Sequence, residues 1–286
     1  MSAEDVVTSK PTGDYALNTV QNPELLEVAY RAIQAGAKTE SVLEEALAID
    51  SDTVGLITSG LRIFNLGGKS DFEYELTSLG FEAGSFLNEF RLHILNSVAS
   101  EANSNDWGLQ SAVLLNLEYL LKENETRFVQ SDEGLIKRID DWHVEQGYEP
   151  QSSSGRMELN RPKFSLWTNQ ATYLGLLHGY KEGRKNAYTV RFDPDLVRET
   201  IEIGAEQAGE GDGINFNEYL KWLSKTFIRV PITAENAIPK PFARTLYELV
   251  RNGKLKITKS GDPTALDLPG IPAHENIAKT PNYLRI

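Results

Sequence analysis

Cysteine is absent from this chain of 286 residues, and histidine and methionine are scarce, with four and two copies. Without cysteine there is no disulfide, no thiolate metal centre and no thiol nucleophile, so a disulfide-stapled secreted domain is excluded. Long apolar runs are also missing, and a membrane-spanning helix needs about 20 apolar residues. The first residues, MSAEDVVTSKPTGDY, are acidic and lack the apolar core of a signal peptide. We therefore expect a cytoplasmic protein without membrane contact.

Negative charge predominates, with 41 acidic against 29 basic residues and a net charge of -12. Spread evenly, this charge would repel a phosphate-bearing partner. It is not even: residues 221–260 carry nine basic and two acidic side chains, whereas residues 1–60 carry three basic and ten acidic ones. The total therefore argues against a protein that coats DNA, but it allows one confined contact in the C-terminal part.

The N-terminal part predicts three short helices followed by a strand. Asn22 before Pro23 is a typical helix start, and Thr39 and Asp50 are further N-cap candidates. The segment after Gly68 begins with alternating apolar and polar residues, as a strand does. This order is typical of a winged helix-turn-helix unit. A short stretch resembles the Y-x-L-T-x-x-G element that closes the wing in MarR- and PadR-like proteins, namely Tyr74, Leu76, Thr77 and Gly80.

Further along, the pattern predicts two long helices over 85–125 and an irregular region over 126–160 with one helix. The apolar and aromatic run 163–180 predicts a single buried helix, and its His178 is interpreted as a core histidine. Helices followed by a strand and a returning wing recur over 208–270, and 271–286 is expected to be a tail. We predict a mainly α fold with small β wings. Its expected parts are a polar tail (1–20), two winged helix-turn-helix units (21–84 and 208–286) and a helical middle region between them (85–207).

The C-terminal unit carries the candidate site. Its cations lie at the start and end of an expected helix and along the strand that follows it. Cations arranged in this way are what DNA or RNA phosphates require. The candidate nucleic-acid-binding residues are Lys240, Arg244, Arg251, Lys254, Lys256 and Lys259. The alternative interpretation is a solvated basic face that pairs with acidic groups of the same chain or of a partner protein.

Catalytic motifs are weak. Asp193 and Asp195 around Pro194 resemble the acidic corner of a PD-(D/E)xK nuclease, but no E-x-K follows, so we interpret Asp193-Pro194 as a helix start. The segment from Asp140 to His143 combines carboxylates and imidazole without ligand spacing to another histidine. The glycine-rich loop 209–213 lacks the Lys-Ser/Thr of a P-loop. We expect no enzyme activity, no metal and no cofactor.

Three further stretches resemble a group of proteins from phage-defence islands. These stretches are the aromatic run 164–175 with the helix start 192–195, the helix 216–231, and the final wing 242–268. They are similar to the winged-helix accessory component, DpdG type, of 7-deazaguanine DNA-modification systems. The resemblance covers about 200 residues at the level of pattern, and it implies a DNA-linked role in antiviral defence without enzymatic activity.

Three hypotheses about function follow. The first is a non-enzymatic adaptor or DNA-binding subunit of a multi-protein, nucleic-acid-directed system, in which the basic face contacts DNA or RNA and the acidic half docks other protein subunits. The second is a pure protein-interaction subunit whose basic patch meets an acidic protein. The third is an enzyme whose cleft assembles residues that are distant in sequence, such as Asp140, His143 and His178.

Overall fold

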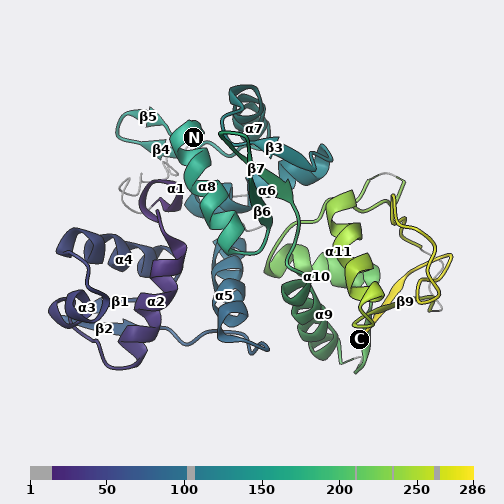
Figure 1. The fold of residues 1–286 in the computed structure, drawn as a ribbon, viewed down its shortest axis with the longest axis horizontal. Helices are drawn as coiled ribbons and strands as arrows, with labels where there is room; N and C mark the ends of the chain where they lie inside the picture. The colour runs from purple at the N-terminus through teal and green to yellow at the C-terminus, as the bar shows by residue number, and fades with distance from the viewer. Residues whose placement is uncertain (1–14, 102–106, 210, 234, 261–264) are drawn as a thin grey trace, which may run out of the picture.

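The computed structural model describes residues 15–101, 107–209, 211–233, 235–260 and 265–286. In these ranges the chain is mainly helical and carries small antiparallel sheets, as the sequence predicts. Figure 1 shows three groups of elements in a row, with the N-terminal group at one end and the C-terminal group at the other. A continuous hydrophobic core runs through all three groups.

The first group consists of three helices and a hairpin. Its elements are α2 (Pro23–Gln34), α3 (Glu40–Leu47), α4 (Ser51–Ile63), β1 (Gly67–Ser70) and β2 (Glu73–Leu76). The side chain of Asn22 caps α2 by accepting the Leu25 N–H (3.1 Å), as the sequence predicts. The hairpin is held to the start of α3, because the Tyr74 N–H donates to the Lys38 carbonyl (2.7 Å).

The second group adds a strand between its first two helices. Its elements are α6 (Ala112–Lys122), β3 (Arg127–Val129), α7 (Glu133–Glu145), α8 (Arg161–Tyr173), β6 (Leu177–Glu182) and β7 (Lys185–Val190). The three strands form one antiparallel sheet in the order β3-β7-β6. A small ribbon of β4 (Gln151–Ser152) and β5 (Gly155–Arg156) lies between α7 and α8.

The third group repeats this order. Its elements are α9 (Pro194–Ala208), β8 (Gly213–Asn215), α10 (Phe216–Thr226), α11 (Lys240–Arg251), β9 (Lys256–Thr258) and β10 (Tyr283–Arg285). The sheet order is β8-β10-β9, so the last strand of the group again lies between the first and the second. Asp193 caps α9 by accepting the N–H groups of Asp195 and Leu196, and Pro194 is the first residue of the helix. The interpretation of this acidic corner as a helix start is thus confirmed.

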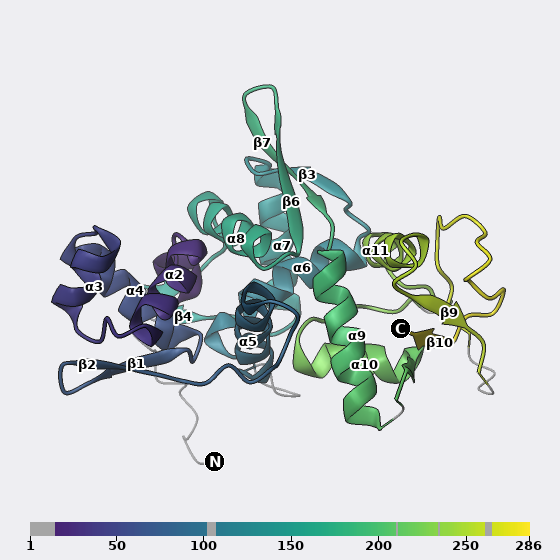
Figure 2. The same ribbon diagram turned by 60° about the horizontal axis from the view of Figure 1, so that its bottom comes forward.

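Two further helices join the groups. The long helix α5 (Phe86–Glu101) touches the first group through His93, whose Nε2 lies 3.0 Å from the Asn65 carbonyl oxygen. It touches the third through Asn96, whose side-chain amide donates to the Thr226 carbonyl (3.0 Å). The short helix α1 (Ala16–Thr19) packs on α8. These contacts make the three groups parts of one packed body (Figure 2).

Three sequence-based expectations need correction. The segment 163–180 is not one helix, because α8 ends at Tyr173 and Gly175 adopts a positive φ of 72°, after which the chain forms strand β6. His178 accordingly lies exposed on β6 and is not a core histidine. The middle region, expected to be helical apart from a strand over 188–192, contains the three-stranded sheet β3-β7-β6.

Both expected tails contact the rest of the chain in the part that the structure describes. The sequence leaves open whether the polar tail 1–20 is frayed or ordered on contact. Tyr15 to Val20 are ordered by contact, because the Gln170 side-chain amide donates to the carbonyls of Ala16 (2.9 Å) and Val20 (3.0 Å), and Tyr15 is buried. The expected tail 271–286 supplies β10, the central strand of the third sheet. Both segments are stabilised by contacts with distant parts of the chain, which local sequence patterns do not reveal.

Across the ranges given above, no helix is both long enough and apolar enough to cross a membrane.

Candidate nucleic-acid interface

Helix α11 presents one apolar and one cationic side. Phe242, Leu246 and Leu249 are fully buried and hold the helix on the core of the third group. The exposed cations are Lys240, Arg244 and Arg251. At 100° per residue, spacings of four and seven residues place these three side chains within about 40° of one another around the helix axis. We call them the α11 stripe.

No carboxylate neutralises the α11 stripe among the residues that the structure describes. Other cations of this part of the chain have carboxylate partners, among them Arg191 and Lys254. No carboxylate oxygen of the described residues lies within 4.0 Å of a charged nitrogen of Lys240, Arg244 or Arg251. The first turn of α11 also lacks an acidic residue. Because the N-terminus of a helix carries a partial positive charge, Lys240 and Arg244 add to a potential that is already positive.

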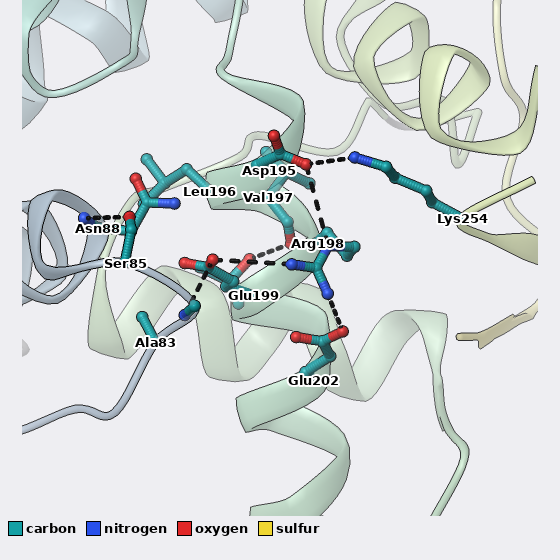
Figure 3. Close-up of polar contacts among 12 residues, drawn as sticks. Ala83, Ser85, Asn88, Asp195, Leu196, Val197, Arg198, Glu199, Glu202 and Lys254 are labelled. Carbon is teal, nitrogen blue, oxygen red and sulfur yellow. Dashed lines mark hydrogen bonds and ion pairs between the residues drawn. The ribbon is translucent and has the colours of Figure 1, made fainter. Parts of the chain in front are cut away.

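Unlike the three cations of the α11 stripe, Lys254 has a carboxylate partner among the described residues. Its Nζ contacts a carboxylate oxygen of Asp195 on α9 (2.6 Å). Figure 3 shows that Asp195 belongs to a network on the same helix, in which Arg198 contacts Glu199 and Glu202. Lys254 therefore links the end of α11 to an acidic helix, and its charge is the least available of the six candidates.

Lys256 lies on the sheet of the third group and Lys259 lies next to it. Lys256 is exposed on β9, directly opposite Arg285 on β10, and Lys259 is exposed just beyond the strand. Arg285 has a carboxylate partner in Asp212 (3.1 Å), whereas no ion pair to either lysine occurs within the described ranges. The structure thus gathers three of the six candidates on the α11 stripe, ties one to α9 and leaves two at the sheet.

One carboxylate interrupts the exposed side of α11. Glu248 lies next to the stripe, and both of its oxygens accept from the Arg191 guanidinium at 3.0 Å. Both hydrogen bonds come from one guanidinium nitrogen of Arg191. Arg191 follows directly after β7, so this contact joins the second group to the cationic side of α11.

The hairpin β6–β7 carries cations that lie outside the basic segment 221–260. Lys181, Arg184 and Lys185 are exposed around its turn, and Glu182 is paired with Arg127 of β3 (2.8 Å). The available signal is local: Gly183-Arg184 lies between Lys181-Glu182 and Lys185, and a glycine-containing pair between two strand-like segments is typical of a hairpin turn. That signal was hidden because the preceding apolar run predicts a helix.

The candidate metal ligands are not brought together. The carboxylate of Asp140 accepts from the Arg156 guanidinium (3.0 and 2.6 Å) and from the Leu159 N–H (2.7 Å). His143 is buried, and burial lowers its pKa to about 4. His178 is exposed on β6. Within the described ranges, no three His, Asp or Glu side chains are grouped as metal ligands.

A shallow depression lies beside Asp140. It has a volume of about 500 Å³ and lies between α7 and the segment 156–161. Its charged lining is mixed, with Lys137 paired to Asp141 (2.8 Å) and Arg156 paired to Asp140. Four carboxylates against three cations leave the lining with little net charge with which to attract a charged ligand.

The first group lacks a cationic side. Its third helix, α4, exposes Asp52 and Leu56, and Lys69 on the hairpin is paired with Glu40 (2.8 Å). At the turn of the same hairpin, Phe72 is 82% exposed. The first group therefore exposes acidic and apolar side chains where α11 exposes cations.

Comparisons of the chain with protein-family models, with curated proteins and with solved structures found no match.

Proposed function

We propose that this protein is a non-enzymatic, nucleic-acid-binding adaptor built from three winged-helix units. The proposal takes the three groups as units over 23–76, 112–190 and 194–285. Support for it comes from the order of helices and strands in the second and third groups, where the last strand lies between the other two. The first group has the same helices and hairpin but a single backbone hydrogen bond in place of the first strand.

The α11 stripe is the observation that carries the proposal. In helix-turn-helix proteins, the last helix of the unit lies in the major groove and basic side chains contact phosphates. Helix α11 holds that place in the third group, and Lys240, Arg244 and Arg251 have no acidic partner among the described residues. Cations near a helix N-terminus oppose the helix dipole at a cost of about 0.3–1 kcal/mol each. A bound phosphate removes that cost and adds an attraction.

The acidic N-terminal part supports the adaptor role. Phosphates are repelled by its excess of carboxylates, so we assign it to docking other protein subunits. The resemblance to accessory proteins of phage-defence islands favours a place in an antiviral system that acts on nucleic acid. The pathway is tested separately by the neighbouring genes: a helicase, nuclease or modification enzyme beside this one supports it, and a conserved unrelated neighbourhood opposes it.

The test is charge reversal followed by binding at several salt concentrations. The variant Lys240→Glu/Arg244→Glu/Arg251→Glu is compared with a matched triple reversal of the exposed cations Lys38, Lys137 and Arg138, which lie on other elements. A fluorescein-labelled DNA duplex of random sequence and an RNA duplex serve as probes. Loss of binding in the stripe variant alone, with a strong salt dependence in the parent protein, is the expected result.

A second triple, Lys254→Glu/Lys256→Glu/Lys259→Glu, measures the remaining candidates. We expect a smaller loss than for the stripe, because Lys254 is already held by Asp195. Binding that is indifferent to salt and to both triples would contradict the proposal.

A protein-interaction subunit without nucleic-acid contact is the second candidate function. It is favoured by Phe72 at the turn between β1 and β2, which is 82% exposed, because aromatic residues are enriched in protein–protein interfaces. Here Phe72→Ser is expected to abolish capture of a partner from nuclease-treated lysate, while the α11 stripe variant retains it. A partner lost with the stripe variant and kept with Phe72→Ser contradicts this assignment.

A further inference from the structure

The hairpin β6–β7 projects from the body of the molecule. Figure 2 shows it rising from the second group, with its turn away from the helices. Its strands pair without interruption from Leu177↔Val190 to Glu182↔Lys185, which leaves Gly183 and Arg184 as a two-residue turn. Six residues of strand extend over about 20 Å. The hairpin therefore forms a stiff arm. The residues at its end are exposed and do not pack in the hydrophobic core.

Charge at the end of this arm is strongly biased. Lys181, Arg184 and Lys185 are exposed there, and Lys181 is held by the Asn186 side chain (2.5 Å). The one carboxylate of the strands, Glu182, is paired with Arg127. After this pairing, three cations remain at the end of the arm without an acidic partner in the described ranges. Core packing does not require them, and their mutual repulsion opposes their gathering there.

The base of the arm touches the cationic side of α11. Arg191 follows β7 directly, and its guanidinium donates hydrogen bonds to Glu248, the carboxylate next to the α11 stripe. The contact neutralises Glu248 and connects the arm to the helix. The cations of the arm and those of the α11 stripe thus lie on two elements that the Arg191–Glu248 ion pair connects. At that contact the carboxylate is paired, so it does not add a free negative charge between the two sets of cations.

We propose that the hairpin β6–β7 and the α11 stripe bind one nucleic-acid duplex together, with Lys181, Arg184 and Lys185 on its phosphates. This inference rests on the proposed function and adds a second contact to it. A duplex is favoured over a single strand, because sites for single strands stack bases on exposed aromatic rings. Among the described residues, Phe72 is the one exposed phenylalanine, tyrosine or tryptophan, and it belongs to the first group.

The experiment removes charge from the arm without changing its fold. The variant Lys181→Gln/Arg184→Gln/Lys185→Gln keeps Gly183 and both strands, and circular dichroism confirms the fold. The control is Lys38→Gln/Lys137→Gln/Arg138→Gln, which changes the net charge equally. Binding to a random-sequence DNA duplex and to one of its strands is measured between about 50 and 200 mM salt.

The slope of log K against log salt gives the number of phosphate contacts. With six cations engaged we expect a slope of about -5 for the parent protein, and the arm variant is expected to lose about 3 from it, at 0.9 per contact. The control keeps the parent slope. An arm variant that binds the duplex with the parent slope overturns this inference, while the α11 stripe variant still tests the proposed function on its own. Tighter binding of the single strand than of the duplex by the parent overturns the choice of ligand.

Discussion

Acid should destabilise this protein through one buried histidine. His143 on α7 is 3% exposed, and its Nε2 finds no hydrogen-bond partner among the described residues. Its ring packs edge-on against Tyr148 at 5.3 Å. Burial, assisted by the Arg156 charge and opposed by Asp140, lowers its pKa from 6.5 to about 4. The imidazole therefore stays neutral in the folded state at a pH where it is charged in the unfolded chain.

The sign and size follow from proton linkage. Between pH 6.5 and about 4, His143 binds a proton in the unfolded chain but not in the folded state. The free energy of unfolding therefore decreases as the pH falls through this range. With one pKa unit worth about 1.4 kcal/mol, His143 removes about 2 kcal/mol between pH 7 and pH 5. His93, whose pKa is also lowered by burial, adds to the same trend.

Urea unfolding at these two pH values, followed by tryptophan fluorescence, measures the effect. His143→Gln is expected to lose about 2 kcal/mol less than the parent between pH 7 and pH 5, whatever its stability at the higher pH. His178→Gln is the control, because that ring is exposed. If the parent and His143→Gln lose the same free energy, the buried, neutral state inferred for His143 is wrong.

Two further predictions concern the third group and its neighbour α5. Leu284→Ala opens a cavity at a fully buried position of β10 and should lower the free energy of unfolding, measured in urea, by about 2–5 kcal/mol. The control Ile286→Ala changes an exposed position and should alter that free energy by about 0.5 kcal/mol or less. Equal losses in the two variants would mean that β10 is not the central strand of the sheet. Burial raises the pKa of Glu199, so the contribution of this side chain to stability falls as the pH rises through and above the usual range of a glutamic acid. Glu199→Gln, which retains an acceptor for the Gly84 N–H, lacks that contribution. The stability of the variant relative to the parent should therefore grow with pH in thermal unfolding scans, and a constant difference contradicts the argument.

Local signals predicted the helices well. Asn22-Pro23 and Asp193-Pro194 combine a capping side chain with a proline at the first helical position, and both mark helix starts in the structure. The helix over 242–250 was also predicted, because apolar residues recur on one side of it. These signals lie within a few residues of the structure that they specify.

Contacts between distant residues were not predictable in the same way. Strand β10 is three residues long and becomes a strand because β8 and β9 lie on either side of it. The helix expected over 163–180 fails for a related reason, since a continuous apolar run does not distinguish a helix from a helix followed by a strand. Gly175 was the available clue, and its positive φ ends the helix.

The candidate site was predictable only in part. The sequence indicated a helix with Lys240 and Arg244 at its start and Arg251 at its end, and α11 has these bounds. The pairing of Lys254 with Asp195, 59 residues away, could not be predicted, and nor could that of Arg191 with Glu248. Charge counting in sequence therefore identifies cations but does not show which of them remain available to a ligand.

The ion pair between Arg191 and Glu248 has a consequence for avidity. Two weak contacts on separate, freely moving modules would each lose orientational freedom on binding, whereas contacts fixed to one another lose it once. After the first contact forms, the second is presented at a high effective concentration, provided that the ligand matches the fixed spacing. The ion pair between Arg191 and Glu248 therefore also makes binding selective for shape. A ligand of the wrong width or curvature can form one of the two contacts but not both.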